Sequence, residues 1–381
     1  MTQRSAEVIV VGGGINGAAI LYHLARRGVR DCLLVERGRI AGGPTGVSSA
    51  VVRQHYQSEL YSRMALDSLR FFQHFAELTE GEAGFRPIGY VLVAREREMP
   101  ALRATVAMHQ RLGIRTSCLT AAQIRELEPL VRVDDLGGGV FEPESGYADP
   151  AGTAQGLVSW AVARGARVWR DTSVTRLLTE GDRVVGVETP RGSVRAARVI
   201  VAAGPWTAGL VRGVGMELPT RPSREPVVTL ECQAGMRPRH VVADVANQIY
   251  LRPEGADLLL VGGLASAPIG TDADPDAFDA RPTNADIAFF SERALAGFPA
   301  LGSARSRGGW AGIYDMSPDR CHIIDELPSA RGCFVVCGTS GHGFKLAPAV
   351  GALAADLVLD RVPPYDTSVF RSSRFGQPPL G

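Results

Sequence analysis

Four residues near the N-terminus have the types and spacing of a nucleotide phosphate site. Gly12, Gly14 and Gly17 form a GxGxxG pattern between a short apolar run and a helical pattern, and Glu36 follows 19 residues after Gly17. Glycines so spaced allow a tight turn, close approach of the backbone to a pyrophosphate and close helix–strand packing, while the acid can accept hydrogen bonds from a ribose diol. The pattern therefore predicts a dinucleotide-binding βαβ unit.

The second chemically distinctive residue is Lys345. All but one of the 41 lysine and arginine residues are arginine, and Lys345 is the exception. Such a bias can reflect genome composition, and the single lysine can then be an accident. Lysine is, however, a compact point charge with a tunable pKa, whereas arginine is a wide planar fork. Lys345 is therefore also a candidate for a position where arginine would not serve.

Composition sets the frame for these residues. The chain has 381 residues, 45% hydrophobic and 21% charged, with a formal net charge of +1. This is globular composition for about two domains, and the charge gives no reason to expect nucleic acid as a partner. We find no apolar run of the ~18–20 residues that a membrane span needs. No secretory signal is apparent and the six cysteines show no CxxC spacing, so we expect a reduced, cytoplasmic protein.

Apolar periodicity predicts the elements that position the candidate residues. A strand over 7–12, a helix after the glycines and a strand over 31–37 form the βαβ unit. Further strands are expected at 89–94, 166–169, 184–188, 198–203, 227–231, 248–252, 258–261 and 333–337, and helices at 58–80, 100–112, 120–127, 151–164, 286–295 and 346–359. We interpret the acidic segment 271–284 as a solvated loop in preference to a metal site.

The two kinds of sheet alternate along the chain. We therefore expect an α/β fold (α+β over the whole chain), with a Rossmann-type domain interleaved with a smaller, mainly antiparallel-sheet substrate domain. The expected segments of the dinucleotide-binding domain are 1–80, 145–215 and 305–381, and those of the substrate domain are 81–144 and 216–304.

Four motifs give the chain a resemblance to a known family. They are VIVVGGGINGAAILYHLARRG with VER at 35–37, GGPTGVSSAVVRQHY at 42–56, RVIVAAGPWT at 198–207 and GCFVVCGTSGHGFKLAPAVGALAADLV at 332–358. With them the chain resembles the D-amino-acid-oxidase superfamily of FAD-dependent oxidoreductases, and most of all its sarcosine oxidase and glycine oxidase branch. The resemblance covers essentially the whole chain and implies FAD as the cofactor.

The resemblance also implies which residues bind FAD. Glu36 and Arg37 would hold the AMP half, and the turn at 338–345 would approach the flavin ring, where a helix N-terminus stabilises negative charge on the reduced flavin. The implied cofactor-binding residues are Gly12, Gly14, Ile15, Asn16, Gly17, Glu36, Arg37, Gly43, Thr45, Ser48, Ser49, Val174, Ala203, Gly204, Gly338, Gly341, His342, Gly343, Phe344 and Lys345.

The same resemblance implies how substrate is held. In this branch an arginine and a lysine clamp the substrate carboxylate, and the matching positions are Arg53 and Lys345. Tyr314 and Tyr250 match aromatic positions that wall the pocket, although either can equally be a core residue. Arg252 is a second candidate for a carboxylate ligand, and we interpret His55 and His109 as structural.

Two positions depart from the family's pattern. Several relatives tether the flavin to a cysteine where this chain has Gly312, so we expect non-covalent FAD. Oxidase members place an oxygen-activating lysine above the flavin, and here that position is Leu260. The electron acceptor can therefore be O2 or another molecule.

No Ser/His/Asp arrangement and no metal cluster appears in the sequence, so the chemistry must come from the cofactor. We expect hydride transfer to flavin N5 from a carbon next to the nitrogen of a small carboxylate-bearing amine (an N-methyl, secondary or glycine-like amino acid), followed by hydrolysis of the imine. Two alternatives stay open, an FAD-dependent 2-hydroxy-acid dehydrogenase and a flavin-binding subunit of a hetero-oligomeric amine dehydrogenase. Homo- or hetero-oligomers are both compatible with the sequence.

Overall fold

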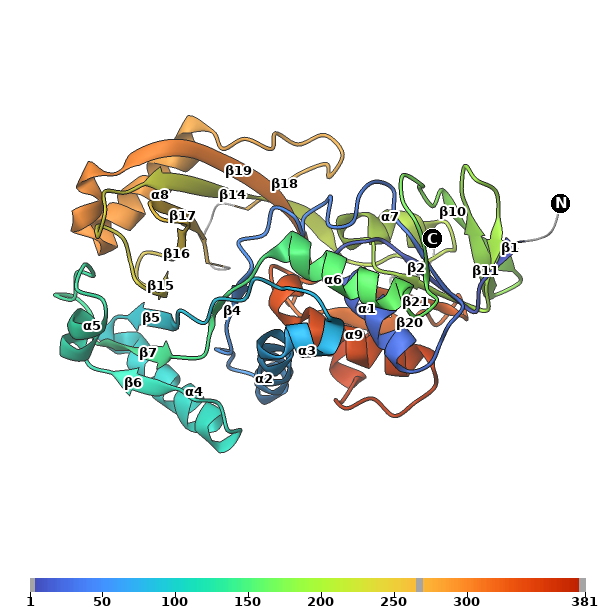
Figure 1. Ribbon diagram of the computed structural model, residues 1–381, viewed down its shortest axis with the longest axis horizontal. Coiled ribbons are helices and arrows are strands. Elements are labelled where there is room, and N and C mark those ends of the chain that lie inside the picture. The colour runs from blue at the N-terminus through green and yellow to red at the C-terminus, as the bar shows by residue number, and fades with distance from the viewer. Residues whose placement is uncertain (1–3, 265–269, 377–381) are drawn as a thin grey trace.

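Two β-sheets of different kinds organise the chain. The computed structural model describes residues 4–264 and 270–376. One half of the elongated molecule is built on a six-stranded sheet and carries both chain ends, and the other half is built on a nine-stranded sheet (Figure 1). The α/β class expected from the sequence, with a mainly antiparallel second sheet, is confirmed.

The six-stranded sheet contains the predicted βαβ unit. Five of its strands, from β9 at one edge to β21, are mutually parallel. Strand β20 forms the other edge and runs antiparallel to β21. The strands, from one edge to the other, are β9 (Arg167–Trp169), β3 (Cys32–Val35), β2 (Val8–Val11), β13 (Arg198–Val201), β21 (Cys333–Cys337) and β20 (Ile323–Glu326). Both faces are covered, so β2, β3 and β21 are fully buried and read as continuous apolar runs.

The two faces of this sheet are covered differently. Val8 and Val10 of β2 pack into a core with helices α1 (Ile15–Arg26), α6 (Pro150–Val162) and α9 (Gly343–Val358). Figure 1 shows these three helices on the same side of the six-stranded sheet. Ile9 and Val11 face the opposite core, under a small sheet and helix α7 (Thr207–Arg212). The small sheet consists of β1 (Arg4–Ser5), β12 (Val194–Arg195), β11 (Arg183–Glu188) and β10 (Arg176–Glu180).

The nine-stranded sheet is antiparallel except where β15 runs parallel to β5. Helices α5 (Ala121–Leu127) and α8 (Asn284–Gly297) contribute to the core on one of its faces, and α4 (Met99–Arg111) contributes to the core on the other. The strands are β18 (Thr271–Asp272), β14 (Arg221–Glu231), β17 (Leu258–Gly263), β16 (Ile249–Glu254), β15 (Val241–Asp244), β5 (Tyr90–Ala94), β7 (Gly138–Glu142) and β6 (Ser117–Leu119), with β19 (Arg305–Met316) paired to β14.

The long strands β14 and β19 run side by side from this sheet toward the six-stranded half (Figure 1). Segment 305–316, which the sequence analysis places in the dinucleotide-binding domain, forms β19 and is hydrogen-bonded to β14 of the nine-stranded sheet. We propose that the domain boundary lies after Met316 and not before Arg305, with the remaining boundaries as expected.

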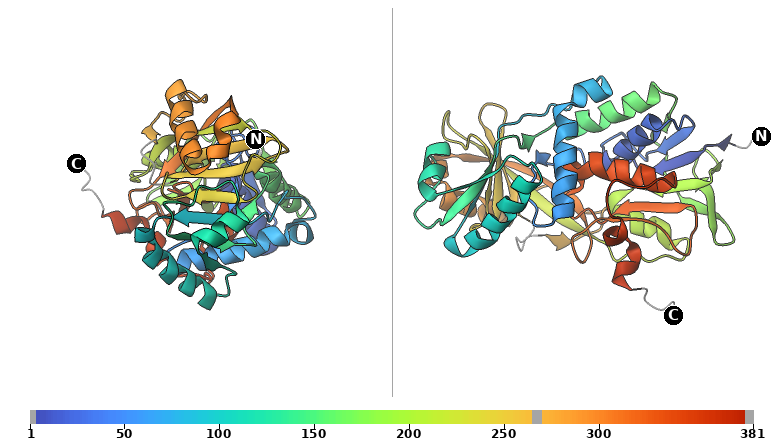
Figure 2. Two further views of the ribbon diagram at one scale, coloured as in Figure 1. Left: turned by 90° about the vertical axis from the view of Figure 1, so that its left-hand side faces the viewer. Right: turned by 90° about the horizontal axis from the view of Figure 1, so that it is seen from below.

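The structure interrupts one expected helix, and β18 forms a short strand within the expected loop 271–284. The helix expected over 58–80 is divided into α2 (Glu59–Gln73) and α3 (Phe75–Thr79), because His74 leaves helical geometry between them. Figure 2 shows α2 standing between the two halves of the molecule. Strand β4 (Val51–Val52) pairs with β8 (Gly146–Tyr147) near this junction. No helix in the described part of the chain is both long enough and apolar enough to span a membrane.

Candidate active site

A cavity of about 880 Å³ extends from the glycine-rich turn after β2 to the inner face of the nine-stranded sheet. Among the residues predicted from the sequence, Arg53, Tyr250, Tyr314 and Lys345 line it, and so do all the cofactor candidates except Gly17 and Gly338. Most of them come from the turn after β2, the 36–53 region, the segment after β13 and the turn before α9, whereas Val174, Tyr250 and Tyr314 come from elsewhere in the chain. Residues far apart in the sequence thus meet along one cavity.

The two exceptions act through the backbone. A Cβ at Gly17 would lie 1.9 Å from the carbonyl oxygen of Gly12, so glycine is required for α1 to pack on the turn. Gly338 has a φ of +64° and donates its N–H to Asp315 Oδ2 at 2.6 Å. Both residues shape the turns that border the cavity.

The predicted nucleotide end is anchored on Glu36, at the end of β3. Its carboxylate accepts hydrogen bonds from the N–H groups of Gly13 and Gly38, at 2.6 and 2.7 Å. Arg37 stacks its guanidinium 3.8 Å from the centre of the Trp206 ring and pairs with Asp276 at 2.8 Å. Asp276 belongs to the acidic segment 271–284, which is largely exposed as expected.

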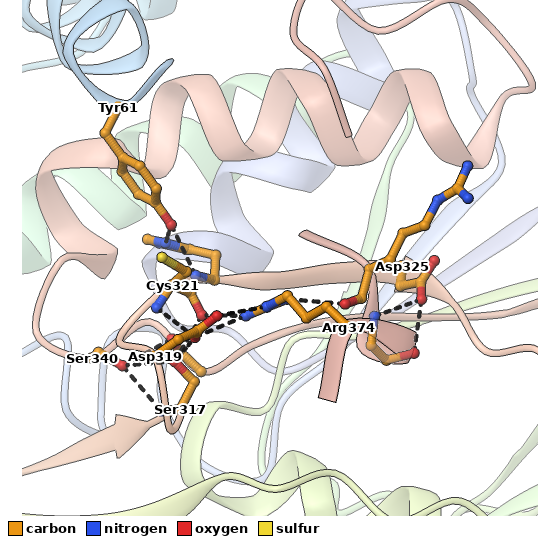
Figure 3. A network of polar contacts seen from close by, with 11 residues as sticks. Tyr61, Ser317, Asp319, Cys321, Asp325, Ser340 and Arg374 are labelled. Atoms are coloured by element: carbon orange, nitrogen blue, oxygen red, sulfur yellow. Dashed lines mark hydrogen bonds and ion pairs between the residues drawn. The ribbon is translucent and has the colours of Figure 1, made fainter. Parts of the chain in front are cut away.

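The turn before α9 is held close to the cavity by packing and hydrogen bonds. Gly341 has a φ of +81°, and a Cβ there would lie 2.6 Å from the ring of Tyr314. The hydroxyl of Ser340 accepts a hydrogen bond from the N–H of Ser317, and Ser317 Oγ in turn donates to the carbonyl of Cys321, within the network in Figure 3. Arg374 closes this network from the C-terminal segment by binding Asp319.

Arg53 follows directly on β4, whose pairing with β8 fixes its place. The half-buried guanidinium stacks 4.6 Å from the centre of the Tyr56 ring and donates to the carbonyl of His55. Burial works against its charge, but nearby Tyr56, Tyr90 and Glu142 outweigh burial and raise the pKa of Arg53. Arg53 therefore remains a permanent cation on the cavity wall.

Lys345 lies in the first turn of α9 and is 9% exposed. Its Nζ donates to the carbonyl oxygen of Gly341 at 3.1 Å. Burial, reinforced by the positive charge of Arg53, holds the pKa of Lys345 well below its usual value. Two basic groups that repel one another at one cavity form a site for an anion, because an anionic ligand would relieve the repulsion.

The two candidate tyrosines line the cavity, whereas Arg252 and Leu260 do not. Tyr250 on β16 and Tyr314 on β19 both line the cavity, and burial raises the pKa of each phenol. Arg252 does not line it, because its guanidinium stacks on Tyr147 and pairs with Glu254 at 2.5 Å. Leu260 is buried in β17 and also lies outside the cavity lining.

The half-buried His55 lies together with the buried His109 and Glu142, next to the segment that carries Arg53. Glu142 accepts hydrogen bonds from the N–H of Gln54 at 2.9 Å and from Ser145 Oγ at 2.8 Å. His109 Nε2 lies 2.9 Å from the carbonyl oxygen of Tyr56. Burial lowers the pKa of His55 to about 3, so the imidazole is neutral. These contacts fix the segment that carries Arg53.

The lining residues that the sequence analysis missed include two acids and a tryptophan. Glu225 on β14 and Asp315 on β19 are acids within runs that read simply as strands, and Trp206 lies in a motif we used only for recognition. Burial raises the pKa of Asp315 to about 7, although the Gly338 N–H and the Thr220 side chain oppose this. Alternation in β14 could have placed Glu225 and Val227 on one face, but it could not show that this face borders a cavity.

Known proteins identify the family. The family described as FAD dependent oxidoreductase (DAO) matches residues 7–357. The chain belongs to this family. Human mitochondrial sarcosine dehydrogenase is 30% identical over 381 residues, which cover 97% of this chain and 41% of that protein. The chain thus spans less than half the length of this relative.

Two further relatives match over nearly their whole length. Glycine oxidase of Geobacillus kaustophilus is 27% identical over 98% of both chains, and its crystal structure superposes with a TM-score of 0.83. The crystal structure of L-proline dehydrogenase from P. horikoshii superposes with a TM-score of 0.90 at 24% identity, covering 98% of each chain. The resemblance seen in the sequence is confirmed, and the DAO family protein described here is an FAD-dependent flavoprotein.

The cavity of this DAO family chain fits FAD. Asn16, in the first turn of α1, lines it together with Gly12 and Gly14. At Gly14 a Cβ would meet only the hydroxyl of Thr45, at 3.2 Å, so the open side of the turn is the cavity itself. An open backbone cradle at the N-terminus of a helix is suited to a pyrophosphate.

Proposed function

We propose that the protein oxidises the C–N bond of a small amino acid, with an N-methyl, secondary or glycine-like amine. The observation that carries the proposal is the pair of basic groups, Arg53 and Lys345, on the cavity wall next to the turn before α9. This pair would hold a substrate carboxylate and so present the carbon next to the nitrogen to the cofactor. FAD, bound along the cavity, would supply the hydride acceptor.

The chain's own residues have separable roles in this proposal. Arg53 supplies a fixed charge, and Lys345 supplies a charge that a bound carboxylate would stabilise. Tyr250 and Tyr314 would wall the pocket and exclude water from the reacting carbon. Burial and the charges of Lys345 and Arg53 hold the pKa of His342 well below its usual range, so this histidine would serve as neutral packing beside the flavin.

We further propose that FAD is bound non-covalently. All six cysteines are free thiols, and none of them lines the cavity. Gly312, at the position where several relatives carry the linking cysteine, does line it. Cys321 lies in the network beneath the turn, with its carbonyl bound by Ser317 and Arg374 (Figure 3).

The electron acceptor and the setting of the protein follow as proposals. Lys345 is the single lysine of the chain, so no second lysine is available to activate oxygen. We propose that an acceptor other than O2, such as a partner electron carrier, reoxidises the flavin faster than O2 does. Free thiols are consistent with a reduced, cytoplasmic compartment.

Anaerobic bleaching of the flavin tests the proposed function. The purified yellow protein is mixed with N-alkyl, D- and L-amino acids and, separately, with 2-hydroxy acids. Bleaching by an amino acid supports the proposal. Bleaching only by a hydroxy acid would favour a 2-hydroxy-acid dehydrogenase, and tight FAD without bleaching by either class would favour an electron-passing subunit.

A further inference from the structure

Glu225 lines the cavity, and the proposed function assigns its carboxylate no role. It projects from β14 into the cavity, on the same wall as Val227, and its backbone lies opposite Gly312 of β19. Tyr250 and Tyr314 are close enough for its charge to act on both phenols. An acid with no assigned partner therefore borders the pocket that would hold the substrate.

The cavity acids differ in their hydrogen bonds. Glu36 is held by two backbone N–H groups, so its carboxylate serves the fold. Asp315 accepts the N–H of Gly338 through Oδ2, while its Oδ1 has no partner among the described residues. For Glu225 the hydrogen bond found among the described residues is donated by Ser223 Oγ, at 2.8 Å to Oε1. A hydroxyl alone compensates little of the cost of burying a carboxylate.

Charges around Glu225 do not neutralise it. Arg221 and Arg320 act on it from a distance, and no arginine or lysine in the described ranges forms an ion pair with it. Burial raises the pKa of its carboxyl, opposed by Ser223 and by these two arginines. A cation placed in the cavity would restore the charge that burial disfavours.

We propose that Glu225 is the subsite for the cationic amino group of the substrate, so that the cavity selects zwitterionic amino acids. Arg53 and Lys345 would take the carboxylate, and Glu225, next to the two tyrosines, would take the ammonium. The same arrangement disfavours dicarboxylates and 2-hydroxy acids, which would present negative or neutral groups to it. This inference rests on the proposed function for the position of the carboxylate.

Matched ligands that differ in one atom test the subsite. N-methylglycine and methoxyacetate have the same shape, as do L-proline and tetrahydrofuran-2-carboxylate, and only the amine of each pair is cationic. Dissociation constants are measured on the FAD-loaded protein, from the substrate dependence of anaerobic flavin reduction where reduction occurs and otherwise from the flavin absorbance. We expect wild type to bind the better amine at least about tenfold more tightly than its ether analogue.

Two variants complete the experiment. Glu225→Gln should weaken the amine by about 10- to 150-fold, while the ether binds as well as before or more tightly because a repulsive charge is removed. Glu126→Gln makes the same charge change at an exposed helix position outside the cavity and should change neither constant. A variant that misfolds would lose its FAD, which the visible spectrum reports, and Glu225→Asp then provides the same comparison with the charge displaced.

The outcomes separate this inference from the proposed function. Equal losses for amine and ether in Glu225→Gln, or unchanged amine binding, would overturn the subsite. A wild-type protein that binds the ether as tightly as the amine would overturn it as well. If the amine is preferred through Glu225 but no amino acid bleaches the flavin, the subsite stands and the proposed reaction fails.

Discussion

Replacing Lys345 by methionine probes the carboxylate clamp most severely. In the structure its Nζ uses one donor on the carbonyl of Gly341, at 3.1 Å, and its remaining donors have no partner among the described residues. A charge-assisted hydrogen bond contributes about 1.5–3 kcal/mol. Lys345→Met should therefore keep its FAD but lower the efficiency of flavin reduction by about 10- to 150-fold. Anaerobic stopped-flow reduction by the best amino acid measures the loss.

Two controls show whether the loss concerns the carboxylate. Lys345→Arg should restore activity only in part, because the guanidinium is larger and its fork fixes a different geometry. An amine substrate without a carboxylate should lose far less in Lys345→Met than the amino acid does. Wild-type efficiency in Lys345→Met, with the amino acid as substrate, would refute the clamp and leave the single lysine as an accident of composition.

The low pKa of free Lys345 adds a pH signature. A bound carboxylate favours the charged lysine, so the pKa in the complex lies above that in the free protein. Between these two values binding takes up a proton, and the association constant falls about tenfold for each unit rise in pH. The slope should vanish in Lys345→Met. A slope that persists in the variant would assign the titration to another group.

Three further predictions concern the cofactor and the cavity. Gly14→Val should fold but purify without FAD, since the structure leaves its branched side chain only the cavity to enter; a cofactor-replete yellow variant would count against the assignment. Acid precipitation should release all the flavin into the supernatant, and colour kept in the pellet would contradict the non-covalent link. In the FAD-free protein, the Asp315 carboxyl has its pKa raised to about 7 by folding, so folding becomes less favourable by up to roughly 4 kcal/mol as pH rises from about 4 to 7. Asp315→Asn should therefore flatten the pH dependence of the free energy of unfolding in that range, and denaturant titrations at several pH values measure it.

Most elements of the fold could be predicted from patterns of residues close together in the sequence. The βαβ unit, the buried strands and the capping of α5 by Thr120 all depend on periodicity and on residues a few positions apart, so they were predictable. The placement of β19 was not, because its partner β14 lies about 80 residues earlier and hydrogen bonds between strands leave no local trace.

The candidate site divides in the same way. Residues within motifs, such as Glu36 and Lys345, could be chosen from type and spacing, and nearly all of them line one cavity. Glu225 and Asp315 could not be chosen, because each is an acid in an ordinary strand and only the long-range pairing of β14 with β19 accompanies its place at the cavity. Arg252 shows the converse, since a suitable side chain was diverted by Tyr147 and Glu254.

The most direct test of the account is the anaerobic rate of flavin reduction by an amino acid deuterated at the carbons next to its nitrogen. At saturating substrate, the account predicts slower reduction than with the undeuterated amino acid, because a C–H bond beside the nitrogen breaks as the flavin is reduced. Absence of reduction by any amino acid, or reduction at an unchanged rate when both carbons carry deuterium, would contradict oxidation of the C–N bond by hydride transfer.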